Sequence, residues 1–67
     1  EELGEKSNVA IVTGNIGNVH ANLNDYSKAL EYFNRALATH DELGEKSCVA
    51  HMTGSIGSVY LNLGAQY

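Results

Sequence analysis

The amino-acid sequence predicts an all-α protein, a helix–turn–helix repeat fragment with three helices in the order A, B, A′. A long internal repeat and apolar residues at helical spacing are the two observations behind this prediction. The 67 residues include no proline, so no expected helix contains a residue that lacks a backbone N–H. We therefore expect continuous helices joined by short turns.

The internal repeat has a period of 40 residues. Residues 2–7 return letter for letter as residues 42–47, and more than half of the positions in 2–27 are identical in 42–67. A fixed period between about 20 and 50 residues is typical of helical units that stack and share their apolar faces. One such unit cannot bury its own apolar face, so the repeat predicts a modular array.

The first helix is expected from about residue 8 to residue 23, because apolar residues recur there at spacings of three and four. These residues are Val9, Val12, Ile16, Val19 and Leu23, and Leu3 precedes them. Ser7 is expected to cap the start of this helix by accepting a hydrogen bond from an unpaired backbone N–H. Asn24 and Asp25 are expected to form the following turn.

The second helix is expected from about residue 26 to residue 43, and the third from about 48 to 63. Gly44 is expected to end the second helix, and Ser47 to cap the third. The apolar side of the second helix contains Ala29, Leu30, Phe33, Ala36 and Leu37. The predicted organisation is 1–6 as the tail of a preceding repeat, 7–46 as one complete unit, and 47–67 as helix A of the next.

The composition argues against several classes of protein. The net charge is −4 at pH 7 and is spread along the chain, so no basic stripe exists to bind nucleic acid. No apolar run approaches the length of a membrane span. A single cysteine cannot form an internal disulfide, which is typical of reducing compartments. We expect a cytoplasmic protein that binds neither nucleic acid nor membranes.

Small and large residues also alternate at fixed offsets. The positions concerned are Thr13, Ile16-Gly17, His20, Asp25-Tyr26, Ala29, Phe33 and Ala36, and Thr53, Ile56-Gly57 and Tyr60 repeat the first part. This pattern resembles the tetratricopeptide repeat family. The 40-residue length is similar to the variant found in kinesin light chain and in G-protein-signalling modulators. The resemblance implies an α–α superhelix that acts as a scaffold for protein–protein interactions.

The resemblance also implies that helix A lines the concave surface on which a partner protein or peptide binds. The polar side chains expected on that surface are Asn15, Asn18, Asn22, Ser55, Ser58 and Asn62. Carboxamides both donate and accept hydrogen bonds, so they can hold an extended peptide by its backbone. The absence of inward lysine or arginine argues against a carboxylate clamp. The alternative is that these are solvated helix positions without a partner.

A structural role is the alternative function. The third helix would pack in part on a second helix B that the sequence does not contain. Its apolar side chains are therefore expected to mediate homo-oligomerisation, by domain swapping or end-to-end stacking. The residues expected at this contact are Ile56, Val59, Tyr60 and Leu63.

No catalytic, metal or cofactor site is expected. Gly14-Asn15-Ile16-Gly17 lies inside an expected helix with no strand before it, which argues against a phosphate-binding loop. Cys48 and His51 are one helical turn apart, with His40 eight residues before Cys48, but no second pair completes a zinc pattern. No nucleophile elbow or paired-carboxylate site is recognisable, so we expect no enzyme.

Overall fold

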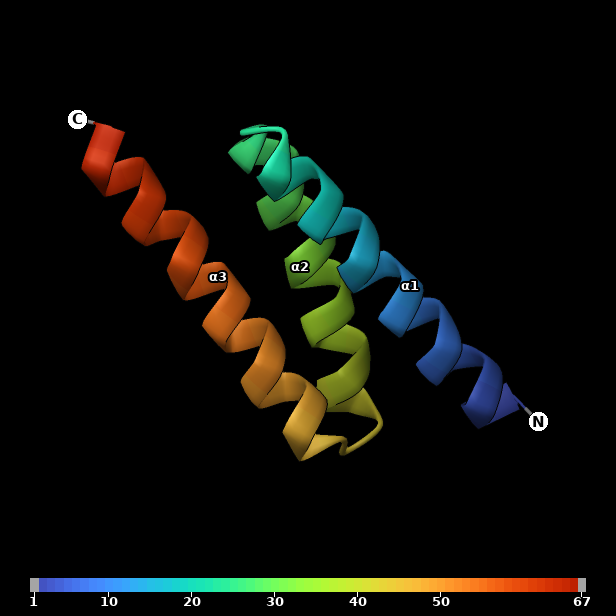
Figure 1. Ribbon diagram of the computed structural model, residues 1–67. Helices are drawn as coiled ribbons and strands as arrows, with labels where there is room; N and C mark the ends of the chain where they lie inside the picture. The colour runs from blue at the N-terminus through green and yellow to red at the C-terminus, as the bar shows by residue number, and fades with distance from the viewer. Residues whose placement is uncertain (1, 67) are drawn as a thin grey trace.

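A computed structural model describes residues 2–66, with side-chain environments from Gly4 to Gly64. Within this range the chain forms three α-helices: α1 Glu2–Asn22, α2 Tyr26–Glu42 and α3 Lys46–Gln66. Successive helices reverse direction, and α2 packs against both α1 and α3 (Figure 1). The prediction of an all-α fragment with three consecutive helices is confirmed.

Both predicted serine caps are wrong, because α1 and α3 begin before the serines. α1 begins at Glu2 and α3 at Lys46, so Ser7 and Ser47 lie inside helices. The Val49 N–H donates to the carbonyl of Glu45 over 3.0 Å, which makes Glu45 the residue that precedes the first turn of α3. The Ser7 hydroxyl instead donates to Glu45 Oε2 over 2.8 Å, and this bond ties α1 to the α2–α3 turn.

The two turns use one residue each in the left-handed backbone conformation. Asn24 has φ +64° and Gly44 has φ +72°, and these residue types tolerate that region best. In the first turn Asp25 caps α2 by accepting from the Lys28 N–H over 3.4 Å. Asn24 and Asp25 therefore form the turn that the sequence predicts, and Gly44 ends α2 as expected.

The core lies along α2, between its two neighbours. Its fully buried apolar residues are Ala29, Phe33 and Ala36 of α2, Ala10 of α1, and Met52 and Val59 of α3. A methyl group added at Gly17 would lie 2.8 Å from the Phe33 ring. Glycine at this position therefore allows α1 to approach α2 closely enough for the phenyl ring to fill the space.

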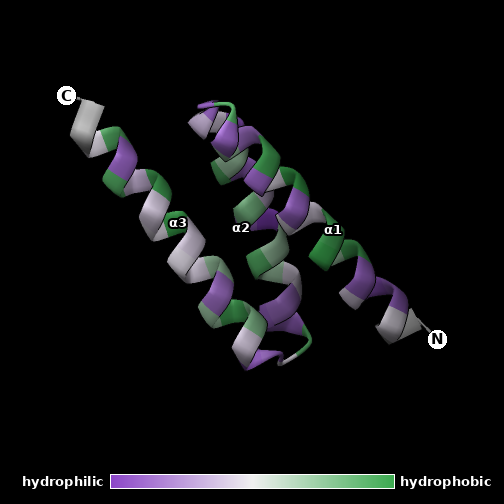
Figure 2. Ribbon diagram, viewed as in Figure 1, coloured by the Kyte–Doolittle hydropathy of each residue, from purple (hydrophilic) through white to green (hydrophobic). Residues whose placement is uncertain are grey.

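The apolar surface of α1 is only partly covered. Figure 2 shows hydrophobic positions along both outer helices, α1 and α3, interrupted by hydrophilic ones. On α1 several of the large hydrophobic residues stay exposed, and on α3 the corresponding ones largely pack on α2. In the described part of the chain, no helix combines the length and the apolar character that crossing a membrane requires.

Candidate functional site

A groove of about 250 Å³ runs between α1 and α3, with α2 beneath it. Its walls carry most of the polar side chains that the sequence predicts as a partner-binding surface. The lining residues are Asn18, Ala21 and Asn22 of α1, Phe33 of α2, and Ser55, Ser58, Val59 and Asn62 of α3. Asn15 is exposed on α1 but does not line the groove. The fold thus brings together residues far apart in the sequence.

The groove has polar walls and an apolar floor. Phe33 and Val59 are 1% and 2% exposed, so they form the apolar floor of the groove but offer little surface to a ligand. The asparagines of the walls and Ser58 are exposed, and Ser55 is half-buried. Among residues 4–64, no lysine, arginine, aspartate or glutamate lines the groove. A ligand held here would be recognised by hydrogen bonds and shape, not by charge.

A protein-family model matches most of the first two helices. Residues 10–41 match the family model of the tetratricopeptide repeat. This chain carries a tetratricopeptide repeat. The match begins within α1, crosses the turn at residues 23–25 and ends within α2. Searches of curated proteins and of solved structures returned no match to the chain.

Tetratricopeptide repeats generally mediate protein–protein interactions, and they are interaction repeats rather than enzymes. Gly17, Ala29, Phe33 and Ala36 of the repeat pattern are all buried at the α1–α2 interface or in the core. His20, at a position that tyrosine occupies in the family pattern, is half-buried and stacks on Tyr32. The two ring centroids are 5.4 Å apart and the ring planes differ by 3°.

The four residues expected to mediate self-association lie on α3, and α2 covers most of them in the single chain. Val59 is 2% exposed in the single chain, and Ile56 and Leu63 are half-buried against the same core. Tyr60 remains 59% exposed. The face that carries Val59 packs on α2 within the single chain, so Tyr60 is the one of the four residues that stays mainly exposed.

An open apolar face runs along α1 to Leu23, just beyond the helix, and we call it the α1 stripe. Its members range from 38% to 70% exposed and are Val9, Val12, Ile16, Val19 and Leu23. A shift of one 40-residue period leads to Val49, Met52, Ile56, Val59 and Leu63, all of which are buried or half-buried on α3. The repeat relates the two faces directly, so equivalent positions are exposed along α1 and largely covered on α3.

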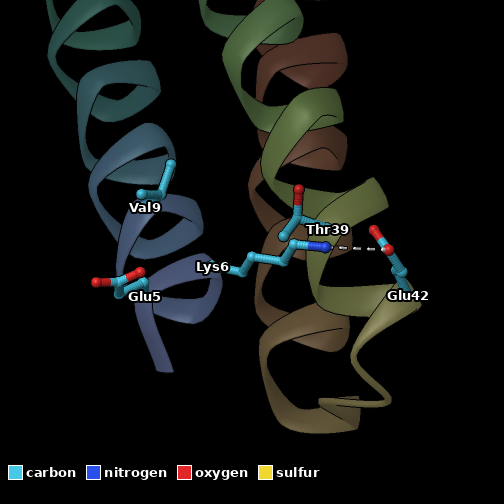
Figure 3. Close-up of a pocket in the computed structure, with 5 residues that line it drawn as sticks. All are labelled: Glu5, Lys6, Val9, Thr39 and Glu42. Carbon is cyan, nitrogen blue, oxygen red and sulfur yellow. Dashed lines mark ion pairs between the residues drawn. The ribbon is translucent and has the colours of Figure 1, made fainter. Parts of the chain in front are cut away.

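A second hollow, of about 350 Å³, lies where the start of α1 meets the end of α2 (Figure 3). Glu5, Lys6, Val9, Thr39 and Glu42 line it, and Lys6 Nζ lies 3.8 Å from Glu42 Oε2. Both partners of this ion pair are more than half exposed. An exposed pair of this kind contributes little stability, and none of the predicted site residues lies here.

Three potential metal ligands converge at the α2–α3 turn. One ligand atom each from His40, Glu45 and Cys48 lies within 4.8 Å of the other two. His51, one helical turn from Cys48 in the sequence, is outside this group. Spacing in the sequence does not point to Glu45, because only the turn brings its side chain back over the end of α2.

Proposed function

We propose that the groove between α1 and α3 binds an extended segment of a partner protein. In this proposal residues 7–46 form one unit and residues 47–67 the first helix of the next, so the groove lies between two consecutive A helices. The observation that supports it is the gathering of Asn18, Asn22 and Asn62 around one uncharged groove. The proposal requires no catalysis and no cofactor.

The spacing of the asparagines suits an extended backbone. Asn18 and Asn22 are four residues apart on α1, and Ser58 and Asn62 are four apart on α3. Four helical residues rise about 6 Å, close to the roughly 6.6 Å that two residues of an extended chain span. Side chains at this interval can therefore bond to every second residue of a ligand. Because each carboxamide both donates and accepts, it can satisfy a peptide N–H and a carbonyl together.

Within residues 4–64, none of the groove's asparagine and serine side chains forms a hydrogen bond to another side chain or to the backbone. They are solvated when the groove is empty, so a ligand replaces bonds to water and does not have to break bonds within the protein. The net gain per neutral hydrogen bond is then about 1 kcal/mol. Several such bonds, with apolar contact to Phe33 and Val59, give weak to moderate affinity.

The test is a binding titration with fluorescent peptides selected from a pool of unstructured sequences against the chain. Asn18→Ala combined with Asn22→Ala is expected to weaken binding roughly tenfold or more, as the loss of two net hydrogen bonds implies. Asn15→Ala is the matched control, because Asn15 is exposed on the same helix but lies outside the groove. Equal affinities of the double variant and the parent chain would refute the groove as the binding site.

The alternative function is self-association, and the α1 stripe favours it. The stripe residues alternate at spacings of three and four, the spacing of the seam in a two-helix coiled coil. We propose that a second copy of this chain covers the stripe with its own α1. A contact between two identical stripes closes as a symmetric dimer. The exposed valine, isoleucine and leucine side chains supply the apolar area that such a contact needs.

Sedimentation across a concentration series tests this alternative. Val19→Asp places a charge in the middle of the stripe and is expected to leave the chain monomeric where the parent chain dimerises. Tyr60→Asp is the control, because Tyr60 is the exposed member of the surface first expected on α3. A dimer that survives Val19→Asp and is lost with Tyr60→Asp would overturn the assignment to α1.

A further inference from the structure

The α2–α3 turn places nitrogen, oxygen and sulfur ligand atoms at one point. His40 lies in the last turn of α2, Glu45 lies in the turn, and Cys48 lies in the first turn of α3. Their ligand atoms all lie within 4.8 Å of one another. This cluster takes no part in the groove between α1 and α3.

The backbone explains why these three residues meet. Gly44 adopts φ +72°, which reverses the chain so that the Glu45 N–H donates to the His40 carbonyl over 2.9 Å. The Glu45 side chain is thereby held beside the imidazole. Cys48 follows Glu45 by three residues, about one helical turn, so its side chain projects on the same side.

The His40 and Glu45 side chains are already held in position. His40 is 2% exposed, and its Nδ1 lies 2.7 Å from Glu45 Oε1. The other carboxylate oxygen, Oε2, accepts from the Ser7 hydroxyl of α1 over 2.8 Å. A carboxylate that is oriented by a second hydrogen bond is typical of the support that surrounds metal ligands.

We propose that His40, Glu45 and Cys48 bind a divalent cation of the zinc class. Imidazole and thiolate ligands favour Zn²⁺ and Co²⁺ over Ca²⁺ and Mg²⁺, which prefer oxygen ligands only. On binding, the cation takes the place of the proton on His40 Nδ1. That proton and the proton of the Cys48 thiol are released to solvent, and the imidazole carries its ring proton on Nε2. Three protein ligands leave the fourth tetrahedral position to water.

The required movement is small. Ligand atoms about 2.0 to 2.3 Å from a tetrahedral cation lie roughly 3.3 to 3.6 Å from one another. The 2.7 Å separation of Nδ1 and Oε1 must therefore widen, and separations of up to 4.8 Å must narrow by about an ångström. Rotation of the half-exposed Glu45 and Cys48 side chains supplies this, while the buried imidazole stays in place.

A bound cation would join the end of α2 to the start of α3. α3 provides one wall of the groove, so the metal would hold that wall in its packed position. Since the unfolded chain lacks the assembled site, binding stabilises the folded state in proportion to metal occupancy. The midpoint of thermal unfolding is therefore expected to rise with the concentration of Zn²⁺.

The test is a titration of the reduced 67-residue chain with Co²⁺, followed by absorption. The expected result is saturation at one ion per chain, with a thiolate-to-cobalt charge-transfer band that Zn²⁺ removes by displacement. Cys48→Ser is expected to abolish that band, and Glu45→Gln to weaken binding at least tenfold. Circular dichroism of each variant verifies that the helices remain.

His51→Ala is the matched control, because His51 is exposed one turn beyond Cys48 and is outside the cluster. It is expected to leave the titration unchanged. The proposal fails if no charge-transfer band forms, or if the band persists in Cys48→Ser. It also fails if Glu45→Gln binds as tightly as the parent chain, or if His51→Ala loses binding. A thermal midpoint that Zn²⁺ does not raise would equally overturn it.

Discussion

Val19 and Val59 occupy the same position in two consecutive units, yet Val19 is 56% exposed and Val59 is 2% exposed. The difference arises because the apolar face of α3 packs on α2, whereas no helix in the described chain covers the same face of α1. Identical residues in a repeat therefore differ in energetic role, and pairs related by the 40-residue shift provide matched tests.

The two valines give the first prediction. Val59→Ala is expected to lower the free energy of unfolding by about 1–3 kcal/mol, because it removes buried methyl groups and leaves a cavity. Val19→Ala is expected to change it by less than about 0.5 kcal/mol, since Val19 is exposed. Urea denaturation of both variants, at concentrations that keep the chain monomeric, measures the difference. Equal losses would mean that α3 does not pack on α2 as described.

Gly17 and Gly57 are related in the same way and give the second prediction. A methyl group at Gly17 would lie 2.8 Å from Phe33, and one at Gly57 would meet nothing within 4 Å. Gly17→Ala is therefore expected to destabilise the fold by about 1–3 kcal/mol through overpacking. Gly57→Ala is expected to stabilise it by roughly 0.5–1 kcal/mol, because alanine loses less backbone entropy in a helix. Thermal unfolding of the two variants is expected to show a lower midpoint for Gly17→Ala and a higher midpoint for Gly57→Ala.

The third prediction concerns the α2–α3 turn. Gly44 has φ +72°, so Gly44→Ala is expected to cost about 1–2 kcal/mol through contact of the new Cβ with the backbone. Gly64 provides the control, since it lies within helix α3 with nothing within 4 Å of an added methyl group. Gly64→Ala is expected to be neutral or stabilising. The same effect of both substitutions on the unfolding midpoint would contradict the left-handed backbone conformation of Gly44.

The fourth prediction concerns acid stability. Hydrogen bonds from His40 and then from Ser7 hold the pKa of Glu45 below its ordinary value of 4.5, although partial burial opposes this shift. A carboxylate whose pKa falls on folding stabilises the fold at pH values above its unfolded pKa. That contribution is lost as the pH falls through the folded pKa.

Denaturation of the parent chain and of Glu45→Gln from about pH 7 to about pH 3 tests this linkage. The parent chain is expected to be the more stable of the two near neutral pH, and the difference is expected to shrink at pH values below 4.5. Glu31→Gln serves as the control, because Glu31 forms only an exposed ion pair with Arg35. A difference that does not vary with pH would contradict the role assigned to Glu45.

Much of the fold follows from local patterns in the sequence. Apolar spacing predicts where α2 lies to within a residue, because its alternation of Ala29, Phe33 and Ala36 with polar residues matches one helical face. The Asn24 turn follows from residue type. The groove was harder to predict from the sequence. Asn18, Asn22 and Asn62 were expected there because of the family resemblance, and Asn15 was expected with them but lies outside the groove.

The hexapeptide that occurs twice shows the limit of such patterns. Residues 2–7 belong to α1, and Gly4 is helical, whereas the identical residues 42–47 end α2, turn at Gly44 and begin α3. The same letters form a turn where the chain must reverse to pack α3 on α2. They continue a helix where no reversal occurs in the described chain. Because the six residues are the same, their intrinsic helix propensity is also the same. Tertiary packing therefore decides whether they form a helix or a turn.

The sequence by itself determined the helices, their order and the modular period, because helical spacing and turn residues act over a few neighbouring positions. Only the tertiary structure decided which apolar face is open, which polar side chains share a groove, and that His40, Glu45 and Cys48 meet. These depend on contacts between residues far apart in the chain, or on the direction of a single turn. A face with nearly the same residues in both units is buried in α3 and exposed in α1, because α2 covers that face of α3 but packs on a different face of α1.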